Sequence, residues 1–130
     1  MTDEQIVRTL AEKVMGWPVC AAMRGSESHR LFLQAPPPRL EVMPTGNALL
    51  WHAPNFPADE WNPLERIQDA FMVVEKMWGL GFWMRLECGG GVIDSCRFST
   101  SAWKGPLQVG NNAPRAICLA AIAATEEQGK

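Results

Sequence analysis

The residues best suited to hold an anion lie at positions 103–115. Trp103 and Lys104 precede a loop that ends in Asn111 and Asn112, and Arg115 follows in the first turn of an expected helix. A helix N-terminus offers unpaired amides and a positive dipole end. Arg115 adds a bidentate fork for phosphate, and Trp103 adds a ring for stacking on a base. We therefore predict a small anionic, nucleotide-like ligand at Trp103, Lys104, Asn111, Asn112 and Arg115.

The alternative for this segment is a plain connecting loop in which Asn112 caps the helix. The overall charge limits the kind of ligand, because 12 basic residues stand against 14 acidic ones and the net charge is −2. Proteins that follow a nucleic-acid backbone usually carry a basic excess. We expect no polymeric nucleic acid as partner, whereas two or three local basic groups are enough for a small anion.

The histidines give little support to catalysis. His29 falls in an expected turn and His52 at a strand end, without partners at metal-ligand spacing. His52 can meet Asp59 or Glu60 across a short loop as an acid/base pair. We favour a surface position for both histidines.

The cysteine, serine and glycine patterns also give little support to catalysis. Cys96, between Ser95 and Arg97, is either a thiolate beside a cation or a buried small hydrophobe, and we favour burial. The glycines at 89–91 lead into a strand, whereas a phosphate loop leads into a helix. No zinc spacing occurs. We predict no catalytic residue, no metal and no cofactor, and hence a protein that is not an enzyme.

Six tryptophans occur beside no tyrosine. Trp17 and Trp78, at helix ends, are expected in the core, and the other four are less clearly buried: Trp51, Trp61, Trp83 and Trp103. Exposed tryptophan often marks an interface or a stacking platform. The surplus of Trp and Met, with hairpin edges that nothing protects, predicts a homo-oligomer, most simply a dimer.

Three helices are indicated by their caps and apolar spacing. A capping box of Thr2 and Gln5 opens a helix over Asp3–Met15. Asn62, Pro63 and Glu65 open a second over Pro63–Trp78, which places Phe71 in the core. The third starts near Pro114 and buries Ile117, Ala120, Ala121 and Ala124.

Strands are expected at Arg30–Gln34, Leu40–Met43 and Ala48–His52, with a weaker one at Val19–Met23. Leu80–Glu87 and Val92–Ser101 form a hairpin with one buried face. The chain is thus predicted to be a single α+β domain over residues 1–130, with an antiparallel sheet of about five strands and three helices packed on it.

An acidic, polar N-terminus argues against a signal peptide. The longest apolar run, Ala116–Ala124, is far shorter than the roughly 20 residues of a membrane span. Four cysteines without Cys-x-x-Cys spacing are typical of reduced thiols. We expect a cytoplasmic protein without a membrane partner.

Five segments together resemble the small bacteriophage "ABA sandwich" domain family, most of whose members have no assigned function. They are Ala11–Trp17, Trp61–Pro63, Asp69–Ala70, Val73–Met77 and Ala113–Ala121. The chain departs from the family in the Pro-rich stretch Gln34–Pro44 and in Arg115, where an acidic residue is expected. The resemblance implies a phage or prophage protein whose antiparallel sheet has helices on both faces. It carries over no catalytic residue.

Other small phage proteins sequester the nucleotide signals of bacterial immune systems, and by this analogy we expect a counter-defence protein that binds such a signal. The alternative is a structural or interaction protein acting through a protein surface, as a host-enzyme regulator or a minor assembly factor. A pocket lined by Trp and Arg favours the first, and a flat apolar Trp patch favours the second.

Overall fold

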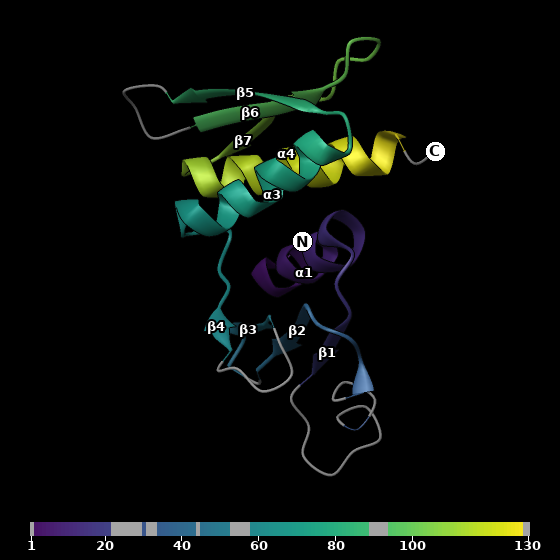
Figure 1. The fold of residues 1–130 in the computed structure, drawn as a ribbon. Coiled ribbons are helices and arrows are strands. Elements are labelled where there is room, and N and C mark those ends of the chain that lie inside the picture. Colours follow the sequence, from purple (N-terminus) through teal and green to yellow (C-terminus); the bar gives the residue numbers. More distant parts are fainter. Residues whose placement is uncertain are drawn as a thin grey trace.

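Two small β-sheets with helices between them form the computed structural model, which describes residues 2–21, 30, 34–43, 45–52, 58–88 and 94–128. Figure 1 shows α3 (Ile67–Gly79) and α4 (Ala113–Gln128) against one sheet, with α1 (Asp3–Thr9) between these helices and the other sheet. No described helix has the length and apolar character needed to cross a bilayer.

The N-terminal helix begins and ends where the sequence indicates. The Thr2 amide donates to Gln5 Oε1 at 2.9 Å and the Gln5 amide donates to Thr2 Oγ1 at 3.2 Å, so the capping box is confirmed. Past Thr9 the helix continues as a π-helix, η1 (Leu10–Met15). Gly16 ends it with a φ of 74°, a conformation that glycine adopts without a Cβ clash.

A four-stranded sheet follows, with the order β1 (Val19–Ala21), β2 (Arg39–Val42), β3 (Ala48–Trp51), β4 (Asp59–Glu60). The first three correspond to strands expected from the sequence. β1 pairs with β2 in parallel, and the other two pairings are antiparallel. Of the expected strand Arg30–Gln34, residues 31–33 lie outside the described residues, and Arg30 and Gln34 are helical, so the strand prediction is wrong at these two positions.

The second sheet consists of β5 (Trp83–Cys88), β6 (Asp94–Ser99) and β7 (Gln108–Gly110), all antiparallel. The expected hairpin is therefore confirmed, although its turn at residues 89–93 lies outside the described residues. α4 packs against this sheet, and its four expected core residues are fully buried: Ile117, Ala120, Ala121 and Ala124. Alanine at three of these positions lets the helix approach the strands closely.

The second helix begins later than expected. Residues 63–65 form a separate turn, and α3 starts after Arg66, whose backbone is extended. The Asp69 carboxylate, in the first turn of α3, accepts a hydrogen bond from the Asn62 amide at 2.9 Å and lies 3.7 Å from the Arg66 guanidinium. These contacts account for the burial of a charged residue.

The buried face of α3 also differs from the expected one. Phe71 is 46% exposed and Trp78 61% exposed, so the prediction that both lie in the core is wrong. The helix instead buries smaller residues and a methionine: Ala70, Val73, Val74 and Met77. α3 packs directly on α4 and η1, and small side chains allow that close approach where a Phe and a Trp would hold the helices apart.

The α+β class is confirmed, with the described strands divided between two sheets of four and three instead of a single sheet of about five. The arrangement of layers differs from the one that the resemblance implies. The described helices lie between the two sheets and do not cover both faces of one sheet (Figure 1).

Candidate functional site

The outer face of the β5–β7 sheet carries the polar groups that form the candidate site. In Figure 1 the described helices all lie on one side of this sheet. Met84, Phe98 and Cys96 are buried or half-buried on that side. Because side chains alternate along a strand, the residues between them point to the opposite side. On β5 these are Trp83, Arg85 and Glu87, and on β6 they are Ser95, Arg97 and Ser99.

Two arginines stand directly opposite each other on this outer face. The register pairs Arg85 with Arg97, and like charges at directly opposite positions destabilise a sheet. Arg85 has Glu87 as an acidic neighbour, with its Nε 3.2 Å from Glu87 Oε1. Arg97 Nε is buried and has no hydrogen-bond partner among the described residues. An anion seated over the two arginines would offset the repulsion between them.

A hollow of about 460 Å³ lies over this pair, within the usual range for a small-molecule site. Its cations are Arg85, Arg97 and Lys104, and among the described residues none that lines it is acidic. Trp83, which is 52% exposed, borders it and offers a ring face for stacking. The hollow thus combines positive charge with an aromatic surface.

The turn that follows β6 forms one wall of the hollow. The Thr100 amide donates to the Trp103 carbonyl at 2.8 Å, and Ser99 pairs with Lys104 as an isolated bridge. The Trp103 ring meets Phe82 edge-on, with the ring centroids 6.2 Å apart. Trp103 therefore packs against Phe82 and also lines the hollow.

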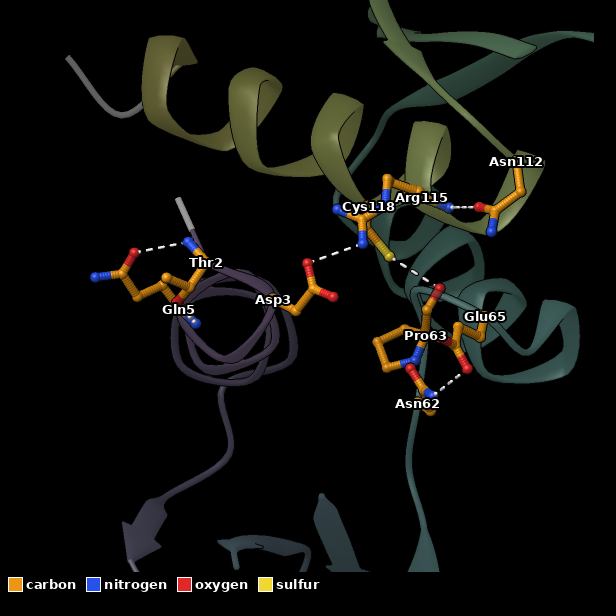
Figure 2. A network of polar contacts seen from close by, with 9 residues as sticks. All are labelled: Thr2, Asp3, Gln5, Asn62, Pro63, Glu65, Asn112, Arg115 and Cys118. Atoms are coloured by element: carbon orange, nitrogen blue, oxygen red, sulfur yellow. Dashed lines mark hydrogen bonds and ion pairs between the residues drawn. The ribbon is translucent and has the colours of Figure 1, made fainter. Parts of the chain in front are cut away.

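The remaining sequence-predicted site residues lie at the start of α4. The Asn112 side-chain oxygen accepts from the Arg115 amide at 2.8 Å, so Asn112 caps the helix. The Arg115 guanidinium donates to Asp3 Oδ1 at 2.8 Å, which ties α4 to the N-terminal helix. Figure 2 shows both contacts, together with the Cys118 thiol, which donates to the Pro63 carbonyl at 3.2 Å. Asn111 is exposed just before this cap.

The five predicted residues therefore fall into two groups. Lys104 pairs with Ser99 at one end of β6, while Gly110, next to Asn111, pairs with Asp94 at the other end. The five steps between Ser99 and Asp94 correspond to about 17 Å along the strand. The structure unites Trp103 and Lys104 with Arg85 and Arg97, and it places Asn111, Asn112 and Arg115 elsewhere.

Sequence reasoning missed Arg85 and Arg97 as partners of Trp103. The signal was present in the alternation of β5, which sets Trp83, Arg85 and Glu87 against the apolar Met84 and Leu86. This alternation alone does not predict the site, because only the register between β5 and β6 brings the two arginines together. The register in turn depends on how α4 selects the buried face of the sheet.

The acid/base pair considered from the sequence also forms. His52 Nε2 lies 3.6 Å from Asp59 Oδ2, and both side chains are largely exposed to solvent. They border a smaller hollow of about 270 Å³ with Arg66 and Asp69. No group of three or more metal-binding side chains gathers within the described ranges.

Comparison with known proteins gives one match. A sequence model described as the phage ABA sandwich domain matches residues 8–122, which is nearly the whole chain. No curated protein and no solved structure matches the chain.

Proposed function

Because the chain belongs to the phage ABA sandwich domain family, we propose that it is a phage or prophage accessory protein that binds a small nucleotide-like anion without catalysing a reaction. The observation that carries the proposal is the hollow on the β5–β7 sheet, where Arg85 and Arg97 face each other beside the exposed ring of Trp83. A small phage protein with such a site is suited to sequester an immune signal of the host, and we place its action in the host cytoplasm.

Binding without turnover agrees with the chemistry of the hollow. Its lining supplies cations, hydroxyls and aromatic rings, which hold an anion in place. A hydrolytic step requires a base within hydrogen-bond reach of the attacking water. His52, the described histidine with an acidic neighbour, borders a different hollow.

Calorimetry with a panel of cyclic and ADP-ribose-type nucleotides tests the proposal. We expect at least one to bind, and Arg97→Gln to weaken it by about 10- to 100-fold, the effect of losing a charged hydrogen bond worth about 1.5–3 kcal/mol. Arg8→Gln is the matched control, since Arg8 pairs with Glu4 on α1, away from the hollow. Absence of binding across the panel, or full affinity in Arg97→Gln, would contradict the proposal.

A second candidate, an interaction protein that works through its surface, is favoured by one feature of α3. Ile67, Phe71 and Trp78 lie at spacings of four and seven residues, so they share one exposed stripe. Under this proposal the stripe lies in a homodimer interface. Light scattering would then give twice the monomer mass of 14.4 kDa, and Trp78→Glu would return it to the monomer value. A wild-type mass of 14.4 kDa at micromolar concentration would rule out the homodimer.

A further inference from the structure

The outer face of the β5–β7 sheet presents three chemically different side chains in succession along β5. Trp83 is level with Ser99, Arg85 with Arg97, and Glu87 with Ser95. Successive steps are two residues, or about 7 Å, apart. Glu87 is not among the residues that line the hollow, so a ligand that fills the hollow and extends along β5 meets an aromatic ring, then two cations and, beyond the hollow, a carboxylate.

The arginine pair in the middle of this series suits a ligand with two adjacent anionic groups. The Cβ atoms of directly opposite residues lie only about 4.5–5.5 Å apart, so Arg85 and Arg97 can both contact one ligand on this face. Each guanidinium presents a planar fork that suits its own phosphoryl group. Two phosphoryl groups joined through one oxygen are adjacent and can each accept from one of the two arginines. A single phosphate cannot give each arginine a phosphoryl group of its own.

Glu87, the last residue in this series, disfavours further negative charge on the ligand. Glu87 is exposed, and its carboxylate already lies 3.2 Å from Arg85 Nε. A third phosphoryl group continuing along β5 would meet this carboxylate and would be repelled. A sugar hydroxyl at the same place would instead donate a hydrogen bond to it.

From this order we infer that the site takes a nucleoside diphosphate, free or esterified to a further sugar, and that Glu87 selects against a triphosphate. The inference rests on the proposed function, and it adds the number of phosphates and the residue that limits it. The base lies on Trp83, and the two phosphates lie on Arg85 and Arg97. Lys104, across Ser99 from Trp83, contributes positive charge at the base end of the hollow.

Calorimetry with AMP, ADP, ADP-ribose and ATP at constant ionic strength tests this order. ADP and ADP-ribose should bind at least about 10-fold more tightly than AMP, because AMP leaves one arginine without its own phosphate. ATP should bind about three- to fivefold more weakly than ADP, as expected for one partly screened repulsion at the surface.

The variant Glu87→Gln keeps the size of the side chain and removes its charge. In this variant ATP should bind at least as tightly as ADP. Glu75→Gln is the control, since Glu75 is an exposed glutamate on α3, outside the sheet, and it should preserve the wild-type preference for ADP.

The possible failures are separable. Binding of these nucleotides that depends on Arg97, but with ATP as tight as ADP in the wild type, would overturn the role of Glu87 and leave the proposed function standing. An unchanged ratio of ATP to ADP affinity in Glu87→Gln would do the same. Absence of binding by all four nucleotides and by the wider panel would overturn the proposed function itself.

Discussion

Arg39 and Arg97 show how different surroundings give one residue type two different uses. Arg39 is buried, donates to the Ala35 carbonyl at 3.0 Å, and lies over the Trp51 ring at 5.6 Å. Arg97 faces a second arginine over an open hollow. The contacts of Arg39 are internal and stabilise the fold. Arg97 lines the hollow opposite Arg85, where a ligand has room to bind.

This difference predicts opposite effects on stability. Arg97→Gln removes a like-charge contact, so the free energy of unfolding should stay within about 0.5 kcal/mol of wild type or rise slightly. Arg39→Gln should lower it by about 1–3 kcal/mol, because the guanidinium that donates to the Ala35 carbonyl and lies over the Trp51 ring is lost. Urea denaturation at low ionic strength measures both. A loss above about 1 kcal/mol in Arg97→Gln would show that Arg97 is structural.

Cys118 gives a pH-dependent prediction. Burial raises the pKa of its thiol far above the ordinary value, and the Arg115 charge offsets only part of this effect. The thiol of the unfolded chain loses its proton near pH 8.5, while the folded chain keeps it. Deprotonation therefore favours the unfolded state as the pH rises, so the stability from this group is complete below about pH 8.5 and declines above it.

Urea midpoints at pH 7.0 and 9.5 should accordingly differ more for the wild type than for Cys118→Ala. The comparison between pH values within each variant removes the constant cost of the lost sulfur. Equal shifts in the two proteins would mean that Cys118 titrates alike in the folded and unfolded states, against the burial seen here.

At the scale of elements, caps and small-residue patterns were readable from the sequence, whereas helix phase was not. The Thr2–Gln5 box and the alanine face of α4 are local signals, and both are confirmed. In α3 two apolar stripes compete at helical spacing, one with Phe71 and Trp78 and one with Val73 and Met77. Which of the two stripes is buried depends on how closely α4 packs against α3. The sequence of α3 alone does not determine that packing.

The observed phase of α3 predicts a contrast between two substitutions. Met77→Ala should cost about 2–5 kcal/mol, since Met77 is fully buried. Phe71→Ala should cost only about 1 kcal/mol, because roughly half of its surface is already exposed. Chemical denaturation of the two variants measures both losses, and a larger loss for Phe71→Ala would restore the helix phase expected from the sequence.

Gly110 allows β7 to approach the first turn of α4. A Cβ at this position would lie 2.8 Å from the Ala116 backbone nitrogen, so Gly110→Ala should cost about 1–3 kcal/mol. Gly79, at the end of α3, has no atom within 4 Å of such a Cβ. Gly79→Ala should therefore be neutral or stabilise by up to about 1 kcal/mol. Equal melting temperatures for the two alanine variants would contradict this packing.

At the scale of the whole molecule, a near-neutral chain brings three cations together at one sheet face, namely Arg85, Arg97 and Lys104. The sequence reveals Trp103 and Lys104 because they stand next to a loop, and it suggests Arg115 because that residue starts a helix. Arg85 and Arg97 are twelve residues apart in the chain and meet only through strand register. Long-range pairing of this kind is the part of a site that residue patterns do not predict, and here it moves the centre of the hollow away from α4.

Two-dimensional ¹H–¹⁵N NMR during a titration with ADP tests the location of the site most directly, because six tryptophan indoles act as built-in probes. The indole signals of Trp83 and Trp103 should shift on binding. Those of Trp17 and Trp61, which pack together in the core with ring centroids 5.1 Å apart, should stay in place. Shifts confined to the backbone amides of Asn112 and Arg115, or no shifts at all, would contradict an anion site on the outer face of the β5–β7 sheet.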